Sequence, residues 1–421
     1  MSAQGNGTAV AKGESLDPSI ALKPCDYESV GAHVEKISKL ASSIAPEDDK
    51  TRLELAETAR KLVRALETPR ETMIKHCWAQ TATMSALTAG VDLGLFNVMT
   101  EDGGKSKKSA DLAKAVGADP ILIARLLRHL GAMGYVEETD ADEYKPTNFS
   151  KSLTIPIIYA GYPVLSGGLL SANNLFHEYL RQNGRKTPTE LADGPLQYAY
   201  KTKNNMFEHL QANQPYGDLF NMHMGGYHQG RASWMDAGFF PVQERLIDGA
   251  DKSGSAPFLV DVGGSIGHDI QEFLEKYPSV PGRLVLQDLQ PVLDKITTLD
   301  SRIEVMGHNF LHEQPIKGSR AYFMHSVLHD WPDVEALKIL ARVKEAMKPG
   351  YSRLLINENV VPQRNATWEA TALDILMMTL LSSRERTEQD WRQLLGDAGL
   401  KITKIWTVAN GVESLIECEL A

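Results

Sequence analysis

The segment LVDVGGSIGHD, residues 259–269, joins a run of apolar residues to a glycine-rich turn and then to the start of a helical pattern. Glycines such as Gly263 and Gly264 allow a tight turn and let the backbone approach a ligand closely. In an open α/β sheet, the first strand-to-helix turn is a place where nucleotide-like ligands dock. The segment therefore predicts an α/β sheet with a ligand site at this turn.

Short apolar segments alternate with helical patterns from about residue 249 to the C-terminus. Strands are predicted at 258–262, 283–288, 303–305, 321–325 and 353–358, with two closing strands at 402–408 and 415–419. Helices are predicted at 269–277, 334–347 and 387–398. Alternation of this kind favours a doubly wound α/β fold, so we expect one sheet that contains these seven strands.

The N-terminal half has a different, mostly helical pattern. Helices predicted at 48–66, 70–99, 110–116 and 121–133 precede two short strands around a turn at 139–142, which is the order of a winged helix. We therefore divide the chain into four parts. These are a disordered or extended tail at 1–45, a helical winged-helix domain at 46–160, a helical linker and substrate-pocket region at 161–245, and the sheet domain at 246–421.

Charge and composition disfavour several classes of protein. The formal net charge of -10 argues against a nucleic-acid binder, which needs excess Lys and Arg to displace counterions from phosphates. The predicted wing is acidic, which favours a protein–protein role over DNA binding, although a DNA-binding regulator remains an alternative. Three widely spaced cysteines without a CxxC motif fit a reducing, cytoplasmic compartment. Prolines interrupt the apolar stretch 153–170, so no membrane span is predicted.

Two carboxylates are spaced for a cofactor around the glycine-rich turn. Asp288 ends the second predicted strand, 27 residues after Asp261, where an acidic side chain accepts hydrogen bonds from ribose hydroxyls. A dinucleotide site is one alternative, and a turn with glycines for packing is another. The spacing GGxxG differs from the dinucleotide pattern GxGxxG, and a carboxylate at Asp261 suits a cationic group better than a pyrophosphate.

A histidine-rich segment, HSVLHDWPD at residues 325–333, follows the fourth predicted strand. Histidine titrates close to neutral pH and is the side chain best suited to take a proton from a hydroxyl group. Glu358 ends the next strand and Glu385 lies in the loop before the following helix. A carboxylate that accepts Nδ1–H would fix the imidazole tautomer and raise its basicity. His329 is therefore the candidate general base.

Several separated motifs resemble those of the plant and fungal small-molecule O-methyltransferases, and they occur in the family's order. The motifs are DVGG at 261–264, QP at 314–315, LHDWPD at 328–333, NENVVP at 357–362 and RERT at 384–387. The resemblance runs from about Ala79 to the C-terminus and is greater to the fungal natural-product branch. It implies a Rossmann-like sheet that binds S-adenosylmethionine (SAM), preceded by a winged-helix dimerisation domain, and hence a homodimer.

The resemblance also implies the role of individual residues. It makes His329 the general base, flanked by Glu358 and Glu385, in a reaction that needs no metal and converts SAM to S-adenosylhomocysteine (SAH). The cofactor would be held by Asp261, Gly263, Gly264, Asp288, Asn309, Phe310, His325 and Asp330. The acceptor would contact Phe207, Met224, Asp374, Met377 and Met378, although core packing explains the methionines equally well.

Two positions depart from the family pattern. Asn309 stands where the family mostly has Asp, and His325 stands where Arg or Lys is common. A neutral imidazole at His325 would weaken a charge contact or provide a second base. The expected reaction is methylation of a phenolic or enolic hydroxyl of a small natural product. The alternative is a repurposed enzyme that keeps SAM as a fixed charge for dehydration or pericyclic chemistry.

Overall fold

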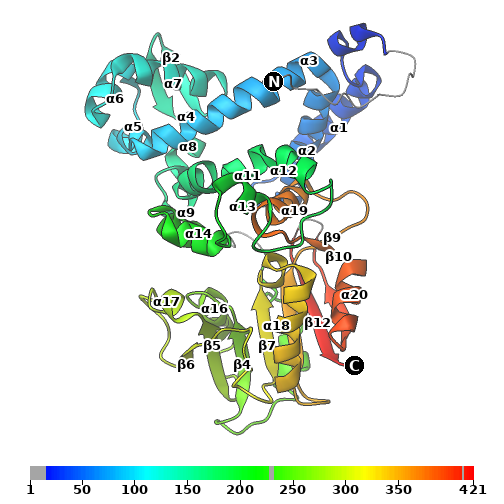
Figure 1. Ribbon diagram of the computed structural model, residues 1–421. Helices are drawn as coiled ribbons and strands as arrows, with labels where there is room; N and C mark the ends of the chain where they lie inside the picture. The colour runs from blue at the N-terminus through cyan, green and yellow to red at the C-terminus, as the bar shows by residue number, and fades with distance from the viewer. Residues whose placement is uncertain (1–15, 227–231, 410–411) are drawn as a thin grey trace, which may run out of the picture. The chain divides into compact units, whose positions relative to one another are not determined.

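The computed structural model describes residues 16–226, 232–409 and 412–421. The chain divides into two compact units, Met1–Lys151 and Ser152–Ala421 (Figure 1). The boundary between the units, after Lys151, therefore lies nine residues before residue 160, the expected end of the helical domain. The segment 161–245, expected to link the domains, belongs to the same unit as the sheet. Each unit is described here by itself.

The first unit is a set of helices with one small sheet. Its helices are η1 Pro18–Leu22, η2 Tyr27–Ser29, α1 Val30–Ser43, α2 Asp49–Leu66, α3 Pro69–Ile74, η3 Lys75–Gln80, α4 Thr81–Asp92, α5 Leu95–Thr100, η4 Glu101–Gly103, α6 Ser109–Val116, α7 Pro120–Ala132 and α8 Asn148–Ser152. The strands β1 Lys107–Lys108, β2 Val136–Asp140 and β3 Glu143–Pro146 pair in the order β1-β3-β2. The predicted sequence of two helices followed by a hairpin is thus present.

The expectation of a tail without regular structure up to residue 45 is wrong for its described part. Helix α1 fills residues 30–43 and packs against α2. The reason is an apolar spacing of three and four residues, with Val30, Val34, Ile37 and Leu40 on one side of the helix. Residues 1–15 of the expected tail lie outside the described residues.

A helical layer opens the second unit. It consists of α9 Pro156–Tyr159, α10 Gly161–Pro163, η5 Val164–Leu169, α11 Leu170–Asn174, α12 Phe176–Gln182, α13 Pro195–Tyr200, α14 Met206–Ala212, α15 Tyr216–Met224 and η6 Gln243–Ile247. Buried residues of η5, α11, α13 and α14 form one apolar cluster with helix α19, Trp368–Leu381. The apolar stretch 153–170 therefore forms short helices, of which η5 contributes buried residues to a core.

A sheet of seven strands forms the rest of the second unit, as predicted. The strands are β4 Pro257–Val262, β5 Arg283–Asp288, β6 Ile303–Gly307, β7 Ala321–His325, β8 Arg353–Glu358, β11 Leu400–Trp406 and β12 Ser414–Leu420. Their order is β11-β12-β8-β7-β4-β5-β6. Strands β4 to β8 pair in parallel with one another, whereas β12 is antiparallel to both β8 and β11.

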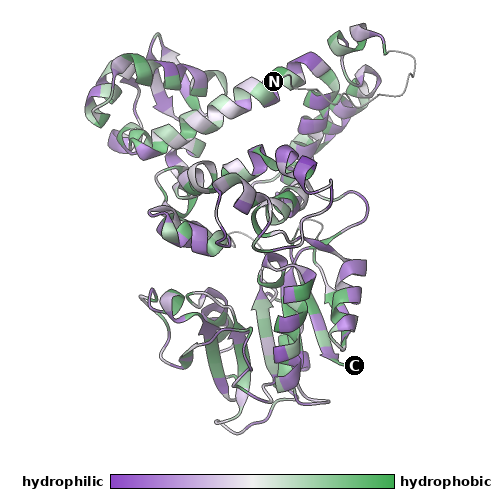
Figure 2. Ribbon diagram, viewed as in Figure 1, coloured by the Kyte–Doolittle hydropathy of each residue, from purple (hydrophilic) through white to green (hydrophobic). Residues whose placement is uncertain are grey.

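Successive side chains of each strand point to opposite faces of the sheet, so the core is divided into two clusters, one on each face. Val260, Tyr322 and Ile356 pack with helices α18 Asp333–Ala346 and α20 Glu388–Asp397. Residues one position away, such as Leu259, pack on the other face with α16 His268–Lys276 and the segment 234–246. Buried parallel strands read as continuous apolar runs because both faces are covered, and Figure 2 shows green along much of the sheet, with purple stretches on β5 and β6.

The strand order places a crevice at one edge of the sheet. The chain runs outward from β4 through β5 to β6 and then returns to the other side of β4 as β7. Ligands of open α/β sheets bind at such a switch point, outside the carboxyl ends of the strands. Asp261, Asp288, His325 and Glu358 all lie at or near the carboxyl ends of their strands.

Among the described residues, no single helix is long and apolar enough to cross a membrane. Two consecutive helical segments, Pro69–Asp92 and Leu95–Gly103, are long and apolar enough only when taken together, and the chain bends by 77° between them.

Candidate active site

The glycine-rich turn follows β4 and is held against the next strand. The amides of Gly263 and Gly264 both donate to the carbonyl of Gln287, at 2.8 and 3.1 Å. Gly263 and Gly267 have φ values of +77° and +90°, a region that side chains disfavour. A Cβ at Gly264 would overlap the carboxylate of Asp261. Glycine is therefore required here both for backbone conformation and for space.

Asp261 is a fully buried carboxylate in this turn. Neither of its oxygens has a hydrogen-bond partner within the described part of the chain. Burial raises the pKa of Asp261 well above its ordinary value, and the nearby carboxylate of Asp269 adds to this effect. A buried carboxylate without partners is costly, so Asp261 lowers the stability of the ligand-free protein when it is charged.

Asp288, by contrast, is fixed by the backbone. Its Oδ2 accepts from the amide of Ser265 at 2.8 Å, and its Oδ1 accepts from the amide of Leu289 at 2.7 Å. The pKa of Asp288 is raised by burial, while the two amides oppose that rise. The carboxylate is therefore held beside the glycine-rich turn, as expected for an acceptor of ribose hydroxyls.

His325 lies between two carboxylates. Its Nδ1 is 2.9 Å from Asp269 Oδ2 and its Nε2 is 2.9 Å from Glu413 Oε2. Burial alone would lower the pKa of His325, but the two carboxylates outweigh it and raise the pKa well above 6.5. Both ring nitrogens are engaged, which argues against a second base. The ring joins β7 to the first turn of α16 and to the residue before β12.

His329 lies on a single helical turn, η7 Leu328–Asp330, directly after β7. Its ring is buried, and Nδ1 is 2.7 Å from Glu385 Oε1. Burial by itself would lower the pKa of His329. The carboxylates of Asp330, Glu385 and Glu358 outweigh burial and raise that pKa to about 10. Donation from Nδ1 to Glu385 leaves Nε2 as the nitrogen that accepts a proton when the ring is neutral.

Two further carboxylates surround this ring. Glu358 Oε1 accepts from the amide of Leu328 at 2.6 Å, while its Oε2 has no partner among the described residues. Burial raises the pKa of Glu358 to about 7. Asp330 Oδ1 is 3.5 Å from His329 Nε2, and burial raises the pKa of Asp330 to about 6. The structure thus brings together the three predicted catalytic side chains, and Glu358 is hydrogen-bonded to the turn of His329 rather than to its ring.

The contact of Asp374 differs from the expectation. Asp374, on α19, accepts the amide hydrogen of Glu385 at 2.9 Å through Oδ1. Its carboxylate therefore fixes the loop that carries the partner of His329, a contact that the sequence did not indicate. Burial raises the pKa of Asp374, and the amide of Glu385 opposes the rise.

Asn309 and Phe310 lie in the loop after β6. Asn309 Oδ1 accepts from the amide of Leu311 at 3.0 Å. The asparagine that replaces the family's usual aspartate therefore makes a hydrogen bond within its own turn. The ring of Phe310 meets Trp331 edge to face, with centroids 5.7 Å apart. Phe310 also lies 3.7 Å from the position of a Cβ on Gly263, which places it beside the glycine-rich turn.

The residues predicted to contact an acceptor are only partly brought together. Phe207 and Met377 belong to the apolar cluster between α19 and the helical layer, where Phe207 meets Phe220 edge to face at 6.1 Å. Met377 is 8% exposed, which favours core packing for this side chain. Met224 and Met378 are half-buried.

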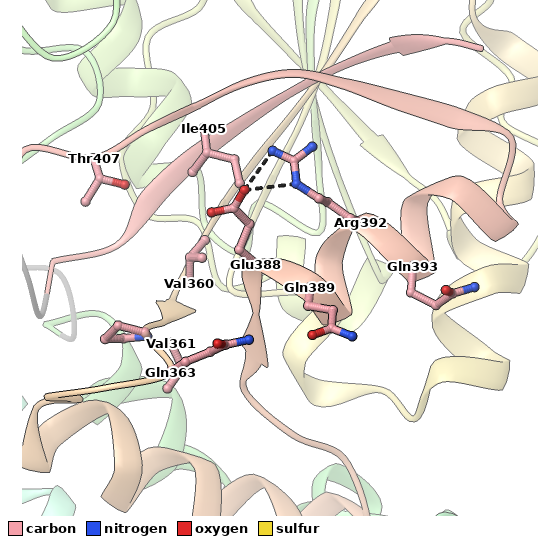
Figure 3. Close-up of a pocket in the computed structure, with 10 residues that line it drawn as sticks. Val360, Val361, Gln363, Glu388, Gln389, Arg392, Gln393, Ile405 and Thr407 are labelled. Carbon is pink, nitrogen blue, oxygen red and sulfur yellow. Dashed lines mark hydrogen bonds and ion pairs between the residues drawn. The ribbon is translucent and has the colours of Figure 1, made fainter.

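An open groove of about 860 Å³ lies elsewhere, between the short strand β9 Val360–Val361, the first turns of α20 and the end of β11. Figure 3 shows that its polar lining includes Glu388 and Arg392, which are joined by hydrogen bonds of 2.7 and 2.9 Å along one helix. Neither His329 nor the glycine-rich turn lines this groove.

Two family models match the chain. An O-methyltransferase domain matches residues 242–401, and an O-methyltransferase dimerisation domain matches residues 78–155. The O-methyltransferase mpaG of Penicillium roqueforti is 37% identical over 94% of this chain and 99% of its own length. The O-methyltransferase mfmE of Annulohypoxylon moriforme is 38% identical over 89% of this chain and 92% of its own length.

Solved structures are similar over nearly the whole chain. A pericyclic reaction enzyme and LepI in complex with SAM both match with a TM-score of 0.83 and 30% identity, over 94% of this chain and at least 99% of theirs. OxaC in complex with sinefungin and meleagrin matches with a TM-score of 0.83 and 28% identity, over 93% of this chain and 99% of its own.

We expect Asp261→Asn to stabilise the ligand-free protein, because it removes a buried charge without partners. A raised folded-state pKa means that the folded chain binds the proton more tightly than the unfolded chain, so wild-type stability falls as the pH rises above 3.8. The gain in thermal unfolding midpoint should therefore be larger at about pH 8 than at about pH 5. Asp288→Asn is the control and should give no gain, because its carboxylate accepts from two backbone amides and an asparagine side chain can accept from only one of them. A lower midpoint for Asp261→Asn at both pH values would contradict this account.

Proposed function

Because the chain belongs to the O-methyltransferase family, we propose that it methylates a phenolic or enolic hydroxyl of a small natural product, with SAM as methyl donor and His329 as general base. The observation that carries the proposal is the buried hydrogen bond from His329 Nδ1 to Glu385 at 2.7 Å. It lies at the carboxyl edge of the sheet, where Asp261 and Asp288 provide a cofactor cradle.

The residues of the cradle fit SAM. The unpartnered, buried carboxylate of Asp261 suits the amino group of the methionine moiety, and Asp288, held by two amides, suits the ribose hydroxyls. Gly263 and Gly264 leave room beside Asp261, and Phe310 with Trp331 provides an apolar wall. When bound, SAM supplies an electrophilic methyl group and leaves as SAH.

His329 would remove the proton of the acceptor hydroxyl through Nε2. A phenol has a pKa near 10, and the pKa of His329 is also raised to about 10, so the transfer of the proton is close to balanced. At pH 7 about one ring in a thousand is then neutral. General-base assistance of this kind contributes about 10²- to 10⁴-fold.

The larger contribution would come from alignment of the acceptor oxygen with the donor. Holding two reactants in line is worth up to about 7–11 kcal/mol in favourable cases. Glu385 fixes the orientation of His329, and Asp374 fixes the loop of Glu385. The base is thereby attached to α19, whose half-buried residue Met378 is proposed to face the acceptor side. OxaC, solved with meleagrin, supports a natural product as the class of acceptor.

A second candidate is the repurposed enzyme, which the structural similarity to a pericyclic reaction enzyme favours. The two candidates differ in their products. Methyl transfer forms SAH and a methylated product in equal amounts, whereas the repurposed enzyme rearranges its substrate without forming SAH. The buried His329–Glu385 pair supports methyl transfer, since such a pair equips a histidine to take a proton.

We also propose a homodimer formed through the first unit. The match of residues 78–155 to a dimerisation domain supports it. Ile121 and Leu122, at the start of α7, are 71% and 45% exposed in the single chain, and exposed apolar side chains of this kind are typical of interaction sites. A cytoplasmic location, expected from the separated cysteines, is part of the same proposal.

His329→Ala should lower methylation by about 10²- to 10⁴-fold, measured by mass spectrometry with a panel of hydroxylated aromatic natural products. Its affinity for SAH, measured by calorimetry, should stay within a few-fold of the wild type, because the cofactor cradle is unchanged. Undiminished methylation by this variant would refute the role of His329. Product formation by the wild type without SAH would favour the repurposed enzyme.

Glu385→Gln should shift the pH dependence of kcat. The active form of His329 is the neutral ring, and the nearby carboxylate of Glu385 raises its pKa. Without that charge the ring loses its proton at lower pH, so the rising limb of the profile should move to lower pH. The plateau should also fall, by up to about 10⁴-fold, because the ring loses its fixed tautomer. A limb that stays in place or moves to higher pH would show that Glu385 does not control the base.

Ile121→Asp should convert the dimer to a monomer, because a charge buried at an interface is costly. Light scattering coupled to gel filtration gives the mass directly. Val305→Asp is a matched control, since Val305 is also exposed, at 48%, but lies outside the dimerisation match. A wild-type mass of one chain would contradict the proposed dimer, and an unchanged dimer in the Ile121 variant would place the interface elsewhere.

A further inference from the structure

Arg386 is a fully buried cation that the proposed chemistry does not use. It follows Glu385 in the sequence and lies on the two-residue strand β10, Arg386–Thr387, which pairs with β9. Its side chain is 0% exposed, and its guanidinium lies 5.2 Å from the ring centroid of Trp391. A buried guanidinium needs partners for its donors, so the positions of those partners show what it holds.

The donors of Arg386 converge on the turn that carries His329. Nη1 donates to the carbonyl of Leu328 at 2.8 Å, and Nη2 donates to the carbonyl of Trp331 at 2.9 Å. Nε and Nη2 also reach Asp333 Oδ1, at 3.0 and 2.8 Å. The guanidinium therefore holds the backbone on both sides of His329 and the carboxylate that begins α18.

The same dipeptide thus contacts the base in two ways. Glu385 holds the ring of His329 through Nδ1, and Arg386 holds its backbone turn. The amide of Leu328 is held separately by Glu358. A shift of the turn would therefore change the distance between His329 and Glu385, because the ring moves with the backbone.

A neighbouring arginine provides a contrast within the same segment. Arg384 Nη2 donates to Asp333 Oδ2 at 2.7 Å, and its Nη1 donates to Asp390 at 3.0 Å. Its side chain is 43% exposed, and its printed hydrogen bonds go to carboxylates rather than to the turn. The two arginines share one partner, yet they differ in whether they hold His329 in place.

We propose that Arg386 is a positioning residue for the base: its buried guanidinium fixes the turn 328–331 so that His329 stays on Glu385. The inference rests on the proposed function of His329. Arginine is required because its planar fork donates in several fixed directions at once, whereas lysine offers a compact charge on a flexible stem. A lysine would keep the positive charge and lose the simultaneous contacts with both carbonyls.

The test compares Arg386→Lys with Arg384→Lys. We expect kcat to fall by about 100-fold in the Arg386 variant, the loss associated with a misplacement of about 1 Å. KM for the acceptor and the affinity for SAH should stay within threefold of the wild type, because the substitution leaves the proposed cofactor cradle unchanged. A threefold change corresponds to about 0.7 kcal/mol of binding free energy. Arg384→Lys should keep kcat within about threefold, because it leaves the turn untouched.

The pH profile separates positioning from a general structural role. A loosened turn weakens the bond from His329 to Glu385, so the rising limb of kcat should move to lower pH in Arg386→Lys. A variant that is merely less well folded would lose amplitude without any movement of the limb, and this result would overturn the proposal. An unchanged kcat in Arg386→Lys would overturn it as well.

A histidine titration in the ligand-free protein gives a readout that does not depend on methyl transfer. With labelled histidine, NMR should show that His329 loses its proton at lower pH in Arg386→Lys than in wild type. That shift would support positioning even if the wild type formed no methylated product, in which case only the proposed function would fail. An unshifted titration would overturn the positioning role.

Asp333→Asn provides a second variant if Arg386→Lys fails to fold. It removes the charge that fixes Arg386 while the carbonyls of Leu328 and Trp331 remain available. We expect Asp333→Asn to lower kcat less than Arg386→Lys does, and to move the rising limb of the pH profile to lower pH as well. A full wild-type profile in this folded variant would count against the proposal.

Discussion

The hydrogen bond between His329 and Glu385 is the contact on which the site depends. It joins a turn after β7 to a loop between α19 and β10, two segments 56 residues apart in the chain. Because the pair is buried, nearby carboxylates act on the imidazole with little screening by water, and those of Asp330, Glu385 and Glu358 together raise its pKa to about 10. The neighbouring groups then serve to keep this bond in place: Glu358 holds Leu328, Asp374 holds the loop, and Arg386 holds the turn.

A second constraint is the concentration of carboxylates at the carboxyl edge of the sheet. Asp261 and Glu358 are both buried, and each has an oxygen without a partner among the described residues. Buried charges destabilise the folded state unless they are paired. Two histidines in this region pair with some of the carboxylates. His325 balances Asp269 and Glu413, while His329 balances Glu385 and Asp330. The two histidines of one short segment therefore differ: His325 holds elements together, and His329 is the base that we propose.

The sequence predicted the fold well wherever an element is marked by a continuous pattern of apolar residues within its own segment. β5, β7 and β8 have the predicted bounds, because each is a buried apolar run that ends at a polar residue. The helix predicted at 387–398 is α20, and it begins at a capping box formed by Thr387 and Asp390. Helix α1 was missed because its apolar face is interrupted by polar residues and becomes clear only beside α2. The roles of Asp374 and Arg386 were also missed, since their partners lie 11 and more than 50 residues away.

The sequence by itself determined the family and the seven-stranded sheet, and it singled out His329, Glu358 and Glu385 as candidates for the base and its acidic partners. These follow from residue type and from spacing along the chain, which carry information about strands, turns and motifs. Tertiary structure decided which nitrogen of His329 is held, that both ring nitrogens of His325 are engaged, and which contacts Asp374 and Arg386 make with the segments around His329. The physical reason is that hydrogen bonds between distant segments depend on distance and direction, and both arise only when the parallel strands place their carboxyl ends side by side.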